Sequence, residues 1–194
     1  EFAEAQELRA SGIEADILLL SPMCDLNEAK QAVALNIICA IGSPESATIL
    51  DLAAQENDRR VRAHLVLDTG FGRFGFLPDD IGFAVKAVED LKFVDIEGTF
   101  SHLSDSFGKD TRHSHAQYRL FMKGVAQLRA AGIQTGMLHL CNSCGFLRFE
   151  DMHLDAVRIG SAFLGRLPFP NHYGLHRIGY MESAVCEVKT LPKG

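Results

Sequence analysis

The sequence lacks the marks of several large classes of protein. No apolar run approaches the roughly 20 residues of a membrane-spanning helix, and no signal peptide is recognisable. Lysine and arginine are scattered within a net charge of −6, so no basic stripe indicates a nucleic-acid partner. We therefore expect neither a membrane nor a nucleic-acid partner. The chain starts at Glu1 rather than at methionine, which leaves open a missing N-terminal segment.

Cysteine is scarce, with an odd count of five and no regular spacing. Cys39, Cys141 and Cys186 lie within apolar runs, where a free thiol behaves as a small hydrophobic group. Cys141 and Cys144 have the spacing of a redox pair, but not its place near the start of a thioredoxin-like unit. No second pair is present to complete a zinc site. We expect free thiols, a reducing and hence cytoplasmic compartment, and no metal.

Short apolar runs alternate with helical patterns along most of the chain. Helices are predicted over residues 1–11 and 111–131, and from the start signals at Asp25, Ser43 and Pro78. Strands are predicted over residues 16–20, 36–41, 62–67, 93–100, 138–141 and 154–157. Strands that are apolar on both faces are typical of a parallel sheet covered by helices on both sides.

Polar or glycine residues follow four successive predicted strands. These clusters are Asp68 to Arg73, Ser101-His102, Asn142-Ser143 and Arg158 to Ser161. No Gly-x-Gly-x-x-Gly follows the first strand, which argues against a dinucleotide-binding fold. One site fed by four strand ends favours a closed (β/α)8 barrel over an open sheet. A full barrel has eight strands in roughly 250 residues, so this chain is short by about two strands.

We therefore predict an α/β fold with a partial TIM-type barrel, lacking its first strands, over residues 1–175. After Pro168-Phe-Pro170 the pattern changes, and residues 181–189 alternate like a strand of an antiparallel region. Residues 176–194 are predicted to start a β-rich C-terminal domain. That alternation stops at Pro192-Lys-Gly194, as if the domain were cut.

A phosphate site is one interpretation of the last two polar clusters. The Ser143 hydroxyl and the backbone of Gly160-Ser161 follow neighbouring strands, and free N–H groups at such turns attract anions. Arg158 adds a fixed positive group that only donates hydrogen bonds. The same residue types also form ordinary turns, so the spacing by itself leaves both interpretations open.

Four motifs resemble those of the alanine racemase family, in the family's order and approximate spacing. They are Asp68-Thr-Gly-Phe-Gly-Arg73-Phe-Gly75, Gly98-Thr-Phe-Ser-His102, His139-Leu-Cys-Asn142-Ser143 and Val157-Arg158-Ile-Gly160. The resemblance runs from residue 1 to about residue 170. It implies a barrel that binds pyridoxal 5'-phosphate, a β-rich C-terminal domain and a homodimer. It also implies interconversion of L- and D-alanine for cell-wall synthesis, by two-base proton transfer on an aldimine.

The resemblance gives roles to the residues around the cofactor ring. Arg73 would reach the phenolic oxygen and help to place the carboxylate of a small amino-acid substrate. His102 would lie against the ring, so that Arg73 and His102 are the expected catalytic residues. Arg158 would donate to the pyridine nitrogen, with His139 supporting it. Because an arginine cannot accept a proton, it should keep that nitrogen neutral.

The same resemblance assigns the phosphate end of the cofactor. Ser143 would contact the phosphate with its hydroxyl, and Gly160 and Ser161 with their backbone N–H groups. Asn142 would brace the loop.

Two family residues have no match in this sequence. The lysine that forms the aldimine belongs to the family's first strand, and the opposite base is a tyrosine in the C-terminal domain. Tyr118, Tyr173 and Tyr180 do not fit its motif, so we expect this chain to be inactive by itself. Val66 stands where many members carry a lysine, and Phe71 replaces the usual methionine.

Three functions remain open on these observations. The first is a racemase, for alanine or else for serine or a basic amino acid. The second is a non-catalytic barrel that carries pyridoxal 5'-phosphate, although the predicted strand at 181–189 argues against it. The third is a decarboxylase of related fold, against which Arg158 argues because that family places an acid at the pyridine nitrogen. His64, which alternates with its strand neighbours, is expected to be structural.

Overall fold

Helices and strands alternate through the computed structural model, which describes residues 1–192. In chain order the elements are α1 (Phe2–Ala10), β1 (Leu18–Pro22), α2 (Leu26–Ala34), β2 (Ile38–Ile41), α3 (Pro44–Glu56), β3 (Val61–Val66), η1 (Pro78–Asp80), α4 (Ile81–Val88), β4 (Val94–Phe100), α5 (Arg112–Ala130), β5 (Met137–His139), α6 (Ser143–Arg148) and η2 (Glu150–Met152). The five strands form one parallel sheet in the order β1-β2-β3-β4-β5. Strands adjacent in sequence are thus adjacent in the sheet, as in the wall of a (β/α) barrel.

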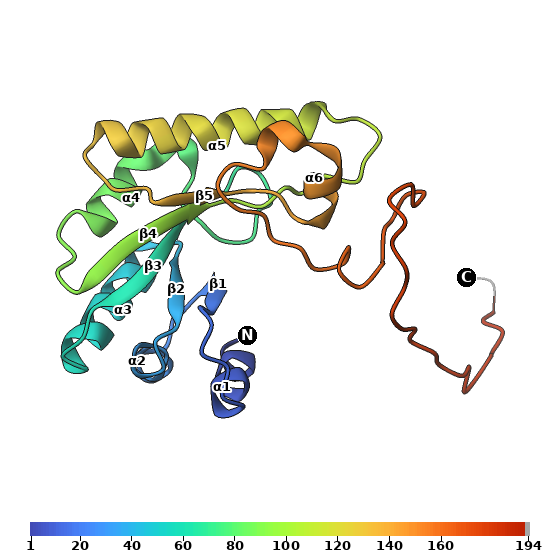
Figure 1. Ribbon diagram of the computed structural model, residues 1–194, viewed down its shortest axis with the longest axis horizontal. Coiled ribbons are helices and arrows are strands. Elements are labelled where there is room, and N and C mark those ends of the chain that lie inside the picture. The colour runs from blue at the N-terminus through green and yellow to red at the C-terminus, as the bar shows by residue number, and fades with distance from the viewer. Residues whose placement is uncertain (193–194) are drawn as a thin grey trace.

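The helices follow the curve of the sheet on its outer side (Figure 1). Helices α2, α3, α4 and α5 pack against one another in sequence order. The main core lies between these helices and the strands, and includes Leu50, Leu65 and Phe121. A smaller cluster, Ala40, Val66 and Phe100, is contributed by β2, β3 and β4.

Two of the predicted helix starts are confirmed by side-chain caps. Asp25 Oδ1 accepts a hydrogen bond from Glu28 N at 2.9 Å, and Ser43 Oγ accepts one from Ser46 N at 3.2 Å. Pro44 follows Ser43 at the first helical position, where its missing N–H costs nothing. Local side-chain chemistry therefore fixes where α2 and α3 begin.

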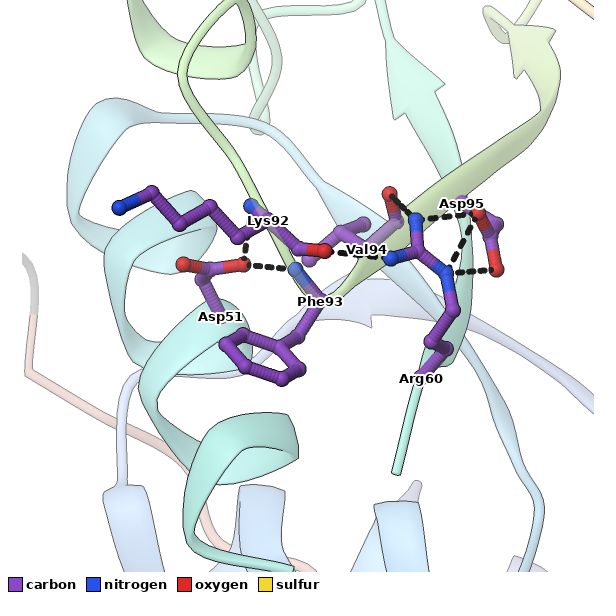
Figure 2. Close-up of polar contacts among 6 residues, drawn as sticks. All are labelled: Asp51, Arg60, Lys92, Phe93, Val94 and Asp95. Carbon is purple, nitrogen blue, oxygen red and sulfur yellow. Dashed lines mark hydrogen bonds and ion pairs between the residues drawn. The ribbon is translucent and has the colours of Figure 1, made fainter. Parts of the chain in front are cut away.

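Side chains also join α3, β3 and β4 at the amino-terminal ends of the strands (Figure 2). Asp51 Oδ1 in α3 accepts hydrogen bonds from Lys92 N at 2.9 Å and Phe93 N at 2.7 Å. Arg60, just before β3, binds both carboxylate oxygens of Asp95 in β4, with its Nη2 2.6 Å from Oδ1. These contacts hold the two strands in register at the end of the sheet opposite to the polar clusters.

The predicted strand at 154–157 is wrong and is replaced by a single parallel bridge between His139 and Ala156. Leu138 N donates to the side-chain Oδ2 of Asp155 at 2.8 Å, so a carboxylate takes the N–H that a ladder would use. Leu154 also adopts a left-handed φ of 55°, which interrupts the extended conformation. The segment still lies beside β5, but as a loop.

The predicted strand at 181–189 is also wrong, because these residues form no strand in the structure. Tyr173 still contacts α6, through a hydrogen bond from its hydroxyl to Leu147 O at 2.9 Å. The end of the chain lies away from the helices and strands (Figure 1), and Val185 and Val188 are 79% and 88% exposed. A strand needs a neighbouring backbone to receive its hydrogen bonds, and the described residues provide none there. The domain boundary at 175/176 stays a prediction, and residues 193 and 194 lie outside the described residues.

The sheet has an open edge at β1, which pairs with β2 alone among the described strands. A hollow of about 760 Å³ lies beside this edge, lined mainly by α1 and β1. None of the helices in residues 1–192 is long and apolar enough to cross a bilayer.

Candidate functional site

A cavity of about 610 Å³ opens at the carboxyl ends of the strands. Its lining includes six of the predicted site residues: His102, Asn142, Ser143, Arg158, Gly160 and Ser161. They come from the loops after β4 and β5 and from the segment that follows the His139–Ala156 bridge. Leu18 and Leu20 of β1 add apolar surface to the same cavity. The sequence thus correctly predicted that separate polar clusters meet at one end of the sheet.

Arg158 is the polar centre of this cavity. Its Nη1 donates to His139 Nδ1 at 2.5 Å, and its Nη2 donates to the carbonyl oxygens of Ser101 at 2.6 Å and Leu140 at 3.3 Å. No carboxylate pairs with this guanidinium in the described part of the chain. Burial lowers the pKa of Arg158 to about 10, so it stays charged at neutral pH.

One donor of Arg158 has no acceptor. Its Nε is the only buried side-chain nitrogen or oxygen without a hydrogen-bond partner among residues 1–192. An unpaired buried donor costs about 1–3 kcal/mol, and a charged one costs more. A ligand with an acceptor atom beside Arg158 would remove this cost.

His102 and His139 flank the guanidinium as neutral rings. Burial lowers the pKa of His102 to about 4 and that of His139 to about 3, and the charge of Arg158 lowers both further in the same direction. His102 Nδ1 lies 3.4 Å from Arg158 Nη2. His139 is 3% exposed and lies behind Arg158 rather than in the cavity lining.

Asn142 braces the loop at the start of α6. Its Oδ1 accepts from Gly145 N at 3.0 Å as the helix cap, and also from Ser106 Oγ at 2.7 Å. Its Nδ2 donates to Leu103 O at 3.1 Å, which ties the loop after β5 to the loop after β4. The bracing expected of Asn142 is therefore present in the hydrogen bonds.

Ser143 collects backbone donors from a second segment. Its Oγ accepts from Gly160 N at 2.8 Å and from Ala162 N at 3.2 Å. Gly160 and Ser161 both line the cavity, and their expected N–H contacts with a phosphate stay a prediction. A Cβ placed at Gly160 would meet no other atom within 4 Å, so this side of Gly160 is open.

Arg73 lies outside the cavity, in an exposed loop after β3. Asp68 Oδ1 holds this loop by accepting from the N–H groups of Gly70 at 2.9 Å, Phe71 at 2.9 Å and Gly72 at 3.1 Å. The Arg73 guanidinium sits over the ring of Phe71 at 4.6 Å. Phe71 in turn contacts His102 edge-on, with 4.9 Å between ring centroids. The structure therefore brings Arg73 near His102 but not into the main cavity, and its role stays a prediction.

The sequence did not place two buried polar residues, His64 and Gln117, at the site. His64 in β3 hydrogen bonds to His139, with 2.8 Å between Nδ1 and Nε2. Gln117 in α5 bridges three loop groups, donating to Thr69 Oγ1 and His102 O at 3.2 Å each and accepting from Ser104 N at 3.0 Å. The only available signal was a polar residue at a position whose neighbours are apolar.

The redox interpretation of Cys141 and Cys144 is not supported. Both thiols are free and buried, and burial raises the pKa of Cys141 to about 11. Redox cysteines instead have lowered pKa values, because the thiolate is the reactive form. These cysteines therefore behave as small core residues.

Comparisons with known proteins show the family of this chain. A family model described as alanine racemase, N-terminal domain, matches residues 1–168. The alanine racemase of Nostoc sp. is 32% identical over 98% of this chain and 51% of its own length, and that of Desulforamulus reducens is 33% identical over 86% and 45%. The chain thus spans about half the length of these relatives.

Solved structures show the same fold. The alanine racemase of Clostridium difficile 630 in complex with cycloserine superposes with a TM-score of 0.84 at 23% identity, over 91% of this chain and 50% of that protein. The alanine racemase from D-cycloserine-producing Streptomyces lavendulae gives a TM-score of 0.76 at 30% identity, over 87% and 44%. The predicted partial barrel is confirmed, and the chain belongs to the family of alanine racemase N-terminal domains.

Proposed function

We propose that this chain is the cofactor-binding part of a pyridoxal 5'-phosphate-dependent alanine racemase. The observation that carries the proposal is the buried, unpaired Nε of Arg158 beside a cavity of about 610 Å³. A pyridine nitrogen is an acceptor that fits this donor. The family relatives named alanine racemase support the same choice.

The residues of the cavity fit the two ends of such a cofactor. The Ser143 oxygen accepts from the N–H groups of Gly160 and Ala162, which leaves its hydroxyl proton to donate to a phosphate, and Ser161 lines the cavity beside it. Arg158 would supply a hydrogen-bond donor for the pyridine nitrogen. His102 is a neutral ring beside Arg158. When bound, pyridoxal 5'-phosphate acts as an electron sink that acidifies the α-proton of an amino acid.

Arg158 then controls the extent of that effect. Because an arginine holds its protons and accepts none, it would keep the pyridine nitrogen of a bound cofactor unprotonated and limit the withdrawal of electrons. Limited withdrawal would favour prompt reprotonation of the α-carbon over slower side reactions, and reprotonation on the opposite face gives the other enantiomer. A decarboxylase with an acid at this position is disfavoured for the same reason.

The proton-transferring bases are not assigned in this chain. Racemisation needs one base on each face of the substrate, and no residue here matches the family's lysine or tyrosine. We propose that the natural protein supplies both and works as a cytoplasmic homodimer, with Arg73 and His102 placing the substrate. This part rests on the motif resemblance. A non-catalytic carrier would share the binding residues but not the reaction.

The test is carried out on the protein as its gene encodes it. Binding of pyridoxal 5'-phosphate is followed by absorbance, and formation of D-alanine from L-alanine by a coupled oxidase assay. Arg158→Ala should weaken cofactor binding at least tenfold, since it removes a charge-assisted hydrogen bond worth about 1.5–3 kcal/mol. His153→Leu, outside the cavity lining, is the matched control and should bind normally. Binding without racemisation would identify the carrier, and no binding would refute the proposal.

A further inference from the structure

A chain of three buried side chains runs across the sheet behind the cavity. Arg158 Nη1 donates to His139 Nδ1 at 2.5 Å, and His139 Nε2 lies 2.8 Å from His64 Nδ1. His139 is 3% and His64 6% exposed, so solvent does not replace either partner. The chain thus connects β3, through β5, to the group that faces the cavity.

The backbone makes room for His64 at a specific place. The register of β3 against β4 shifts between Ala63, which pairs with Ile96, and His64, which pairs with Gly98. A Cβ at Gly98 would overlap the ring of His64, so the ring occupies space that only a glycine leaves. Such irregularities in a strand are known devices for redirecting a side chain near a site.

The hydrogen bonds fix the positions of the protons. An arginine can only donate, so His139 Nδ1 must be the acceptor and carries no proton. A neutral His139 then has its proton on Nε2 and donates it to His64 Nδ1. His64 is left as the Nε2–H form in turn. One proton order satisfies both bonds, and an additional proton on either ring would place two donors face to face.

We propose that His64 is a positioning residue for Arg158. By accepting from His139, His64 selects the His139 form whose Nδ1 holds Nη1, and this fixes the guanidinium at the wall of the cavity. The inference deepens the proposed function and rests on it only for the identity of the ligand. His64 touches neither the cavity nor any reacting atom.

The surroundings keep both rings neutral. Arg62 in β3 and Arg158 are the charged groups that act on His64, and burial with these charges lowers its pKa to about 4. Gly98 in β4 brings no charge, and His139 in β5 is held neutral by burial and by Arg158. At neutral pH the proton order is therefore maintained without an acidic partner.

The test begins with ring-nitrogen NMR of the natural protein without cofactor. The expected result is Nε2–H for both His139 and His64. A His139 carrying its proton on Nδ1 would overturn the inference, whatever the cofactor affinity, and this measurement needs no variant.

Two substitutions then separate positioning from packing. His64→Asn keeps an acceptor oxygen close to the place of Nδ1, whereas His64→Leu fills the space without an acceptor. The Leu variant should bind pyridoxal 5'-phosphate about tenfold more weakly and the Asn variant within about threefold of wild type, the difference expected from one hydrogen bond. In the Leu variant the Nε2–H of His139 loses its acceptor while Arg158 still faces Nδ1, so the Nε2–H form should be less populated than in the Asn variant.

Equal binding by both variants and wild type would overturn the inference, as would equal weakening by both. The expected tautomers with no affinity for pyridoxal 5'-phosphate in the wild type would instead refute the proposed function, while the positioning of Arg158 would stand.

Discussion

Acid should destabilise this protein well above the pH at which its carboxylates titrate. His64 and His102 have pKa values lowered from 6.5 to about 4, and His139 has one lowered to about 3. In the unfolded chain these rings take up protons as the pH falls through 6.5, whereas in the folded chain they do not. The unfolded state therefore binds more protons, and the free energy of unfolding decreases as the pH falls.

The loss of stability in acid follows from the difference between the folded and unfolded pKa values of the three histidines. Each ring contributes about 1.4 kcal/mol per pH unit while its folded form stays neutral, or about 2 kcal/mol from pH 6.5 to about pH 5. His64 and His139 share one hydrogen bond, so their contributions are coupled, and the three rings together give about 4–6 kcal/mol. That is a large part of the roughly 5–15 kcal/mol that holds a domain folded.

Urea unfolding of the natural protein at about pH 7 and about pH 5 measures this difference. His102→Gln removes one of the three rings, so its acid sensitivity should be about two thirds that of wild type. If the free energy of unfolding at the two pH values agrees within about 1 kcal/mol, the rings are not neutral in the folded state, and the proton order across His139 is wrong.

Three further substitutions test how the loops are held. Ser143→Ala leaves the N–H groups of Gly160 and Ala162 without their acceptor, so urea unfolding should show a loss of about 1–3 kcal/mol, and the affinity for pyridoxal 5'-phosphate should fall with it. Gln117→Leu leaves several buried groups without a hydrogen-bond partner and should lower the free energy of unfolding by about 3 kcal/mol or more. Gln127→Leu, on the exposed face of α5, is the control and should stay within about 0.5 kcal/mol of wild type. Asp68→Asn keeps one acceptor oxygen for the backbone N–H groups but removes its charge, and should cost about 1 kcal/mol in the same assay while exposing the Arg73 loop to faster proteolysis. Unchanged stability in any of the three would show that the corresponding loop is held by other contacts.

The order and class of the elements could be predicted because their signals are local. Buried strands read as apolar runs, and a cap such as Asp25 or Ser43 acts within one helical turn. The two wrongly predicted strands are segments whose structure depends on pairing with another strand. Residues 154–157 keep a single bridge to β5, because the Asp155 side chain takes the N–H of Leu138. Residues 181–189 have no partner strand among the described residues.

The side of the sheet that carries the site could be predicted from the sequence. Parallel strands deliver their carboxyl ends to one side of a sheet, so residues that follow them, such as His102, Ser143 and Arg158, converge. Which of them reach the cavity was not predictable, because it depends on how each loop bends. The loop after β3 is held by Asp68 and keeps Arg73 over Phe71, outside the cavity.

His64 shows what sequence patterns cannot supply. Its alternation with strand neighbours indicated a structural role, and the structure buries it at 6% exposure. Its bond to His139 requires that β4 skip one residue against β3, so that Gly98 rather than Glu97 lies opposite. In an uninterrupted register, Glu97 would pair with His64 and the ring would lose the space that Gly98 leaves. The extra residue in β4 therefore decides which side chains position Arg158. With it, His139 and His64 form a chain from Arg158 to β3, and without it His139 would hold Arg158 alone.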